Sequence, residues 1–260
     1  MRRLHLFEIT DKKWCPQSVR GTVTDYMQFG VMRWKSDIAI ASVLRQALDR
    51  LGVHQVVDLC SGSGGPWLGM LKAFEDTWPP VRVCLTDKYP NVSAFKYVCD
   101  HSHGKFDFSS EPVDAAHVPE SLVGFRTLFT AFHHFRPSEA RAILEDAANC
   151  GQGIALFEMT ERTPRTLFIY MAISLLMPFC IPFLRPFRWS RLLWTYLIPI
   201  APVVQLYDSF ISCLRTYSLQ ELQELTEDIH KKEYLWETGV IRDHHSPVPI
   251  TYLLGYHQQT

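Results

Sequence analysis

The sequence predicts an α/β fold in which helices cover both faces of a mostly parallel sheet, and three observations support this prediction. Short apolar runs at residues 55–58, 81–87 and 154–158 each end in a carboxylate, which is typical of buried strands with polar tips. A glycine-rich turn at residues 62–65 follows the first of these strands. Helical patterns, such as the amphipathic segment 137–149, alternate with the strands, as they do in α/β domains.

Length and composition limit the class of protein. The chain has 260 residues, 47% of them hydrophobic, which is enough for one large core with or without a small cap. The formal net charge is -1, so no broad basic surface indicates nucleic acid as a partner. The seven cysteines form no Cys-x-x-Cys pair, which favours reduced thiols in a cytoplasmic protein, without disulfides or a bound metal. The amino terminus is too polar for a signal peptide.

The stretch at residues 55–67 joins the first strand to a tight turn. A helix over residues 36–51 precedes it, with Ser36 as the expected N-cap and Gly52 at its end. Asp58 lies at the tip of the strand. The glycines that follow lack Cβ atoms, so backbone N–H groups of the turn can approach a ligand closely.

This stretch, Val-Val-Asp-Leu-Cys-Ser-Gly-Ser-Gly-Gly, resembles the first motif of class I S-adenosylmethionine-dependent methyltransferases. Cys60 stands where that family usually has its first glycine. The resemblance implies S-adenosyl-L-methionine as cofactor and S-adenosyl-L-homocysteine as product. The cofactor-binding residues that it implies here are Asp58, Cys60, Ser61, Gly62, Ser63 and Gly64. The alternative is a NAD-type Rossmann oxidoreductase, but the third glycine of its Gly-x-Gly-x-x-Gly pattern falls on Trp67.

The second strand, at residues 81–87, also ends in a carboxylate. Asp87 comes one strand–helix–strand unit after Asp58, and an acidic side chain there can accept both hydrogen bonds of a ribose diol. The resemblance therefore implies that Asp87 and its neighbour Lys88 bind the cofactor. The alternative is that Asp87 only caps the turn that follows it.

A third motif is expected in the polar segment 104–123, which is predicted to be a loop. Val113-Asp114-Ala115 resembles the family motif in which an Asp binds the adenine amino group and a small residue covers the ring. The resemblance thus implies that Asp114 and Ala115 bind the cofactor. The alternative is that Asp114 is an ordinary solvated loop residue.

The fourth strand, predicted within residues 124–135, runs into a loop that contains two histidines. Open parallel sheets bind ligands beyond the carboxyl ends of their strands. The resemblance places Ala131 and Phe132 near the sulfonium of the cofactor and His133 near the acceptor. A neutral imidazole can accept the proton of a hydroxyl group as it attacks the methyl group.

Two further residues are candidates for the chemistry. His134 is the second imidazole, and for it a structural role with bonds to the backbone is the favoured alternative. Glu158 lies at the tip of the fifth strand, at residues 154–158. It is expected to orient His133 or to contact the acceptor, and the alternative is that it bonds only to local backbone.

The segment 163–215 is predicted to be a hydrophobic insertion after the fifth strand. Residues 167–184 carry no charge, and a second apolar run covers residues 192–206. Prolines in both runs would break a membrane-spanning helix. We therefore expect a helical cap with an apolar lining, and the alternatives are a monotopic surface on a bilayer and a homodimer interface.

The carboxyl-terminal part returns to the sheet. Ser218 and Glu221 form a capping box at the start of a helix over residues 218–229. Residues 234–241 and 250–256 are predicted to be strands. The methyltransferase family ends with such an antiparallel hairpin, so the resemblance implies a Rossmann-like sheet of seven strands.

The chain is thus predicted to have three parts, which are an amino-terminal lid (1–35), a methyltransferase core (36–162 and 216–260) and the insertion (163–215). In the family such an amino-terminal segment often lies across the cofactor mouth, so Tyr26 and Phe29 are lid and substrate candidates. The alternative is that they pin a peripheral helix to the core. Arg215 and Tyr217 are expected to contact an acceptor carboxylate or phenol, or else to form a structural salt bridge.

The predicted function is methyl transfer from S-adenosylmethionine to a hydrophobic small molecule, with oxygen favoured as the acceptor atom. An apolar cap over the site is not expected to bind a polar acceptor such as a sugar or a nucleotide. One alternative is a membrane-surface methyltransferase acting on a lipid or quinone, with peripheral membrane contact, and the oxidoreductase is another. A homodimer is an open prediction.

Overall fold

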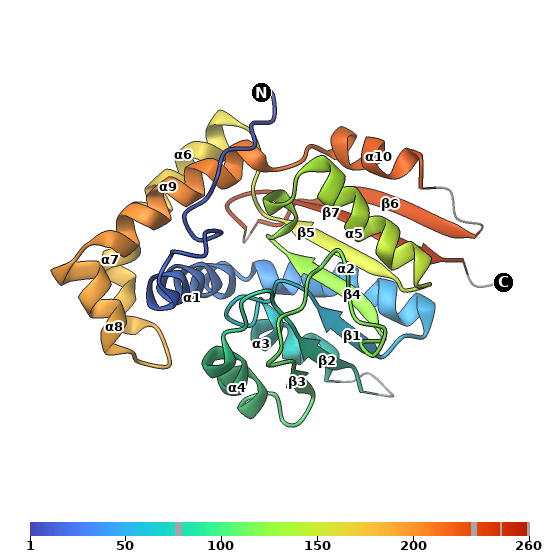
Figure 1. Ribbon diagram of the computed structural model, residues 1–260, viewed down its shortest axis with the longest axis horizontal. Helices are drawn as coiled ribbons and strands as arrows, with labels where there is room; N and C mark the ends of the chain where they lie inside the picture. The colour runs from blue at the N-terminus through green and yellow to red at the C-terminus, as the bar shows by residue number, and fades with distance from the viewer. Residues whose placement is uncertain (76–79, 230–232, 245, 259–260) are drawn as a thin grey trace.

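The computed structural model describes residues 1–75, 80–229, 233–244 and 246–258. Its centre is a seven-stranded sheet in the order β3-β2-β1-β4-β5-β7-β6 (Figure 1). The strands are β1 (Gln55–Asp58), β2 (Arg82–Leu85), β3 (Phe106–Phe108), β4 (Phe125–Phe129), β5 (Ile154–Glu158), β6 (Tyr234–Ile241) and β7 (Ile250–His257). β1 to β5 are parallel, and β7 runs antiparallel to β5 and β6. The predicted seven-stranded, mostly parallel sheet is confirmed.

Helices cover both faces of this sheet, as predicted. One face carries α2 (Ser36–Leu51), α3 (Trp67–Met70) with the 3-10 turn η1 (Leu71–Phe74), and α4 (Val92–Asp100). The other face carries α5 (Pro137–Asn149) and α10 (Leu219–Glu227). Successive strand residues point to opposite faces, so Val56 joins the core under α2 and Val57 joins the core under α5.

Several element boundaries differ from the sequence prediction. Lys35, in a left-handed conformation, is the N-cap of α2, and the expected cap Ser36 is the first helical residue. β3 lies within the segment predicted to be a loop, because three residues with a central Asp give little strand signal. The capping box of Ser218 and Glu221 is present in α10.

The insertion forms a helical cap beside the sheet (Figure 1). It consists of α6 (Pro164–Leu175), α7 (Met177–Cys180), η3 (Ile181–Phe183), α8 (Trp189–Leu192), the π-helical turn η4 (Leu193–Leu197) and α9 (Ile200–Arg215). The amino-terminal helix α1 (Gln17–Arg33) packs against it, where Val23 and Tyr26 share an apolar cluster with Met177 and Val204. The preceding segment runs along α9, and the backbone N–H of Leu4 donates to the carbonyl of Leu214.

Gly64 provides a test of the packing between the turn after β1 and the helix α4, which contains Val98. A Cβ built on Gly64 would lie 2.5 Å from Cγ2 of the buried Val98, and the backbone φ is +105°. We expect Gly64→Ala to lower the free energy of unfolding by about 3 kcal/mol, because it combines backbone strain with overpacking. Gly104→Ala is the matched control, since Gly104 has φ +76° and open space around its Cβ position. It should cost about 1 kcal/mol, and equal losses in urea titrations of the two variants would contradict the assigned contact.

Candidate functional site

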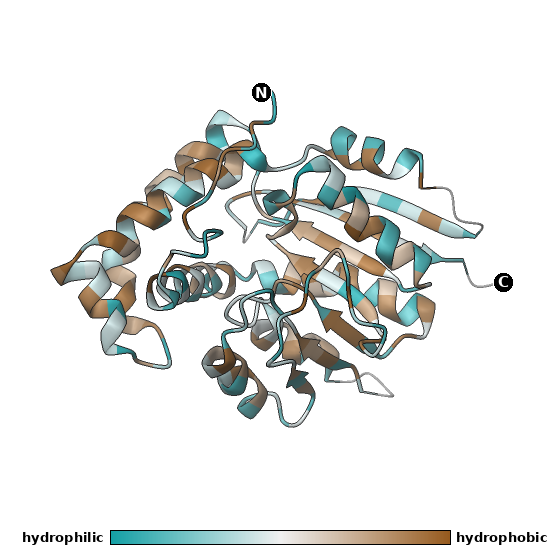
Figure 2. Ribbon diagram, in the orientation of Figure 1, coloured by the Kyte–Doolittle hydropathy of each residue, from teal (hydrophilic) through white to brown (hydrophobic). Residues whose placement is uncertain are grey.

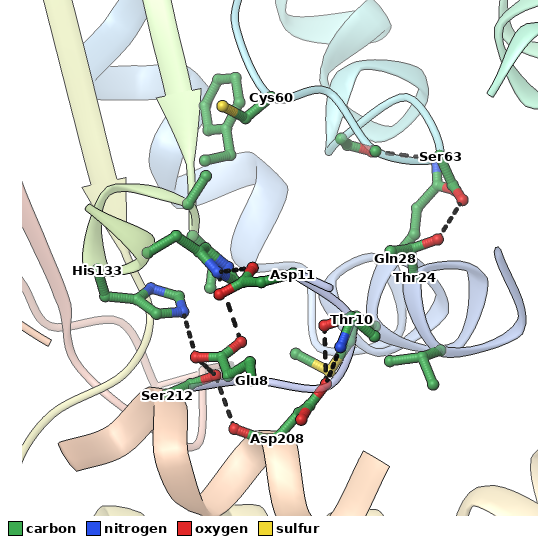
Figure 3. Close-up of a pocket in the computed structure, with 18 of the residues that line it drawn as sticks. Glu8, Thr10, Asp11, Thr24, Gln28, Cys60, Ser63, His133, Asp208 and Ser212 are labelled. Atoms are coloured by element: carbon green, nitrogen blue, oxygen red, sulfur yellow. Dashed lines mark hydrogen bonds and ion pairs between the residues drawn. The ribbon is translucent and has the colours of Figure 1, made fainter. Parts of the chain in front are cut away.

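A cavity of about 500 Å³ lies beyond the carboxyl ends of β1, β2, β4 and β5 (Figure 3). The sheet contributes residues of the loops that follow these strands, which are Cys60, Ser61, Gly62, Ser63, Gly65, Pro66, Asp87, Lys88, Tyr89, Thr130, Ala131, His133 and His134. The amino-terminal segment and α1 contribute Glu8, Thr10, Asp11, Val23, Thr24, Met27, Gln28 and Val31. The helix α9 contributes Gln205, Asp208, Ser209 and Ser212. Three separate parts of the chain therefore enclose one site.

The glycine-rich turn forms one wall of the cavity. Cys60 has φ +58°, in the left-handed region that favours glycine, which accounts for the glycine usual at this place in the resembling family. The backbone N–H of Gly62 donates to Oδ2 of Asp87 over 2.9 Å. The turn after β1 is thus fastened to the tip of β2, and both line the cavity.

Asp58 is hydrogen-bonded to Ser61 of this turn, and it does not line the cavity. Its carboxylate accepts hydrogen bonds from Ser61 Oγ (2.6 Å) and Thr127 Oγ1 (2.7 Å). Complete burial raises the pKa of Asp58 to about 7, against the opposing effect of these hydrogen bonds. The predicted contact of Asp58 with the cofactor is therefore replaced by a contact with the turn. Gly64 likewise packs on Val98 and is absent from the lining.

Asp87 is placed to bind a diol. Its Oδ1 accepts the backbone N–H of Tyr89 over 2.8 Å, and its Oδ2 accepts that of Gly62. A carboxylate offers about four lone-pair sites, so roughly two remain for hydroxyl groups in the cavity. Asp87 thus caps the following turn, which was the alternative role, and it also lines the cavity, where its predicted contact with the cofactor stays a prediction.

The third predicted motif lies outside the cavity. Asp114 forms an ion pair with Lys88, with 2.8 Å between Oδ2 and Nζ, and this bond lowers the pKa of the Asp114 carboxyl group. Lys88 lines the cavity, but Asp114 and the buried Ala115 do not. Phe132, another predicted cofactor residue, packs in the core under α5, whereas Ala131 does line the cavity.

His133 and Glu158 form a buried pair at the carboxyl end of the sheet. His133 lies in the 3-10 turn η2 (Phe132–His134) after β4, and Glu158 is the last residue of β5. Oε2 of Glu158 lies 2.8 Å from Nδ1 of His133, and Oε1 accepts the backbone N–H of His133 over 3.1 Å. Burial would raise the pKa of Glu158, but its charge interaction and hydrogen bonds with His133 lower it. Glu158 thus orients His133, as one of its predicted roles requires.

The other ring nitrogen of His133 points toward Glu8, which lines the cavity together with His133 (Figure 3). A carboxylate only accepts hydrogen bonds, so in the neutral ring of His133 the proton is on Nδ1 and Nε2 has a free lone pair. Nε2 is buried and has no hydrogen-bond partner among the described residues. Its closest acidic neighbour is Oε1 of Glu8, at 3.7 Å. This nitrogen is therefore able to accept a proton from a group bound in the cavity.

His134 is in a different electrostatic environment. Its Nδ1 lies 2.7 Å from Oδ1 of Asp11 and 3.5 Å from Oε2 of Glu8. Burial would lower the pKa of His134, but the two carboxylates outweigh it and raise the pKa to about 9. The imidazole is consequently protonated near pH 7. The ring is thus a structural cation, but its partners are carboxylates and not the backbone groups that the alternative expected.

Arg215 holds these groups together and does not contact the cavity. Its guanidinium lies 3.2 Å from Oε1 of Glu8 and 2.7 Å from Oδ2 of Asp11, and it also donates to the backbone carbonyls of His133 and His134. The hydroxyl of Tyr217 donates to the carbonyl of Phe135 over 2.9 Å. Neither Arg215 nor Tyr217, which were predicted to contact the acceptor, lines the cavity, and the contacts described here agree with the structural alternative.

The predicted lid residues of α1 do not line the cavity and pack in the core of the cap, as the alternative expects. Tyr26 is buried and its hydroxyl donates to the carbonyl of Ile173 over 2.6 Å, while Phe29 packs on the same apolar cluster. The residues of α1 that reach the site are Thr24 and Gln28. Thr24 Oγ1 lies 2.8 Å from Ser63 Oγ, and Gln28 Nε2 donates to the carbonyl of Gly65 over 3.0 Å.

The cap helix α9 lines the cavity with a polar face, whereas an apolar lining was expected of the cap; Tyr170 of α6 also lines the cavity. Gln205, Asp208, Ser209 and Ser212 all project from α9 into it. Their spacing of three and four residues marks one side of a helix, and this stripe in an otherwise apolar run was the sequence signal available. Asp208 also accepts the backbone N–H groups of Ile9 (2.8 Å) and Thr10 (3.0 Å), so it holds the amino-terminal segment over the site.

Glu8, His133 and His134 place possible metal-ligand atoms within 4.8 Å of one another. Two features oppose a divalent cation there. The Arg215 guanidinium already pairs with Glu8, and His134 would have to lose the proton that its raised pKa retains. We therefore assign these residues to a hydrogen-bonded charge network.

Solved structures with a similar fold are methyltransferases. An O-methyltransferase family protein from Burkholderia thailandensis is 14% identical, with a TM-score of 0.51 over 90% of this chain and 59% of that chain. The mitomycin 7-O-methyltransferase MmcR is 14% identical, with a TM-score of 0.51 over 86% and 53% of the two chains. The CurJ carbon methyltransferase is 9% identical, with a TM-score of 0.52 over 85% and 54%.

These similarities establish that the chain has the class I methyltransferase fold. The chain spans less than two thirds of the length of each of these proteins. No protein-family model matches the sequence, and no curated protein matches it. Since O- and C-methyltransferases both have this fold, the acceptor atom has to be inferred from the side chains of the site.

The network around Arg215 yields a prediction about stability. Arg215→Met should lower the free energy of unfolding by about 3 kcal/mol, because it removes the guanidinium that pairs with the buried Glu8 and with Asp11. Arg141→Met is the control, since Arg141 pairs with Glu145 and Asp228 on the surface. Its unfolding midpoint in urea should equal that of the unsubstituted protein, and a similar midpoint for Arg215→Met would contradict the assigned network.

Proposed function

We propose that this protein transfers a methyl group from S-adenosylmethionine to a hydroxyl group of a small, largely apolar molecule. The observation that carries the proposal is the buried Nε2 of His133, which lines the cavity without a hydrogen-bond partner among the described residues. Its ring is fixed through Nδ1 by Glu158. A base held in this way is needed where the attacking atom carries a proton.

The cofactor would lie between the glycine-rich turn and Asp87. The turn brings Cys60, Ser61 and Gly62 to the cavity, and Asp87 has acceptor sites left for the ribose hydroxyls. Trp67 supports this assignment over a nicotinamide dinucleotide. Its indole is fully buried at the position where a dinucleotide turn needs glycine for close helix–strand packing.

The chemistry requires two things of the chain, which are alignment of the acceptor and removal of its proton. The cofactor supplies a methyl group on a sulfonium, which is already activated. The cavity would align the acceptor oxygen with that group. His133 Nε2 would take the hydroxyl proton as the oxygen–methyl bond forms and the sulfur–methyl bond breaks, with the electron pair of the broken bond left on the sulfur of S-adenosylhomocysteine. The resulting imidazolium would lie between two carboxylates, since Glu158 contacts Nδ1 and Glu8 lies 3.7 Å from Nε2.

The acceptor would occupy the part of the cavity between His133 and the cap. Apolar side chains there include Met27, Met159 and Tyr170, which support an apolar body. Two polar atoms of the lining, Thr130 Oγ1 and Gln205 Oε1, are buried without a hydrogen-bond partner among the described residues. They are suited to orient polar substituents of the acceptor, because an unpaired buried polar atom gains most from a ligand partner.

Calorimetry tests the proposed cofactor site. S-adenosylhomocysteine should bind, and NAD should not. Asp87→Asn should weaken the binding by about tenfold to a hundredfold, because it removes a charged acceptor of hydroxyl hydrogen bonds. Asp114→Asn is the control and should change the affinity less than about threefold, since Asp114 lies outside the lining. Binding of NAD in place of S-adenosylhomocysteine would refute the proposal.

The proposed base is tested by turnover with a labelled methyl donor and an extract of small molecules, with the products identified by mass. His133→Ala should reduce kcat by about 10² to 10⁴ and leave the affinity for S-adenosylhomocysteine unchanged. Glu158→Gln should reduce kcat more than it raises KM, because it acts through the orientation of His133. His117→Ala, at an exposed histidine, is the control. Full activity of His133→Ala would exclude His133 as the base.

A further inference from the structure

Most residues of the cap helices are hydrophobic (Figure 2), and many of their large side chains are exposed. The exposed large side chains of α6 to α9 and their connections, here named the cap surface, are Phe168, Leu175, Leu176, Phe179, Phe183, Phe187, Trp189, Leu193, Tyr196, Leu197, Ile198, Ile200, Val203 and Phe210. Soluble monomers rarely expose contiguous apolar patches of more than a few hundred Å². The cap is therefore oriented with its polar stripe inward and its apolar side outward.

The charges between the start of α6 and the middle of α9 all have one sign. Between residues 166 and 207 the sequence has no Asp, Glu or Lys, and its charged residues are Arg185, Arg188 and Arg191. Arg191 is buried against Asp25, at 2.5 Å, and Arg188 lies 3.6 Å from the same carboxylate. Arg185 is exposed beside the cap surface, and no ion pair joins it to a described residue. The exposed charge in this region is thus positive.

The apolar helices of the cap are bent. Among the described residues, no single helix has both the length and the hydropathy needed to cross a bilayer, whereas two bent helix pairs pass that test together. The pairs are Pro164–Leu175 with Met177–Phe183, bent by 48°, and Trp189–Leu197 with Ile200–Arg215, bent by 82°. The bends turn the apolar segments back at the end of the cap that lies farthest from the sheet (Figure 1).

We propose that the cap surface docks on an anionic lipid bilayer, with its aromatic and aliphatic side chains in the interfacial layer and Arg185 against lipid phosphates. Trp, Tyr and Phe beside arginines are the composition that favours the bilayer interface. Burial of the apolar side chains supplies the larger part of the binding free energy, and the positive charge selects anionic lipid.

A bilayer fits these observations better than a second copy of the chain. In a symmetric dimer the same patch would face itself, so Arg185 would meet like charge and find no acidic partner on the opposing cap. A fluid bilayer also adapts to the bent outline of the cap, which a flat protein surface does not. Docking of this kind does not depend on methyl transfer, so the two proposals can fail separately.

Flotation of the purified full-length chain with vesicles tests the proposal. The chain should float with vesicles of phosphatidylcholine and phosphatidylglycerol. The double variant Phe183→Glu/Leu197→Glu, at positions 71% and 77% exposed, should lower the partition coefficient by more than about tenfold. Val123→Glu is the matched control, because Val123 is 59% exposed but precedes β4, at the end of the sheet opposite the cavity. It should bind within about twofold of the unsubstituted chain.

The source of selectivity is tested with a third variant. Arg185→Gln should weaken binding to the anionic vesicles by about fivefold and leave binding to pure phosphatidylcholine vesicles unchanged. Thermal unfolding of each variant should match that of the unsubstituted chain, because the substituted side chains are exposed. Failure of the unsubstituted chain to float, or equal loss of binding in Val123→Glu, would overturn the proposal. So would sedimentation showing a dimer that Phe183→Glu/Leu197→Glu dissociates, without vesicle binding.

Discussion

The contact between the Glu158 carboxylate and the His133 imidazole determines what the site can do. One carboxylate accepts both the ring Nδ1–H and the backbone N–H of the same residue, so it fixes the ring plane and the tautomer together. The sheet sets this distance, since β4 and β5 pair in register up to Phe129 and Phe157. Thr130, at φ +49°, then turns the chain so that His133 comes back over the tip of β5. A buried base with one free nitrogen results from ordinary strand pairing.

A network of paired charges beside His133 encloses the site and balances its buried charges. Glu8 and Asp11 come from the amino-terminal segment, His134 from the loop after β4, and Arg215 from the end of α9. Each buried charge in this group has a partner of opposite sign, which offsets the cost of removing it from water. The same contacts tie three segments distant in sequence over one cavity. The network therefore acts both as an electrostatic neighbour of His133 and as the fastening of the amino-terminal segment.

The sequence predicted the strands, helices and strand-tip carboxylates, which depend on local pattern. It missed the side-chain contacts that depend on residues distant in the sequence. Strands and helices followed from periodicity, and Asp87 and Glu158 from their places at strand tips. Asp58 looked equivalent to Asp87, but its partner Thr127 lies 69 residues away on the neighbouring strand and turns the carboxylate from the cavity. Glu8 and Asp11 gave no signal, because their role exists only once α9 lies beside them. The sequence showed that the cap is hydrophobic, but overall hydropathy does not predict which side of a helix faces the cavity.

The tautomer of His133 offers the most direct measurement of the central claim. Nitrogen NMR of histidine-labelled protein at neutral pH, with the His133 signals assigned by substitution, reports which ring nitrogen carries the proton. We predict a protonated Nδ1 and an unprotonated Nε2. A proton on Nε2 would contradict the account, because that nitrogen could then no longer accept one from a substrate.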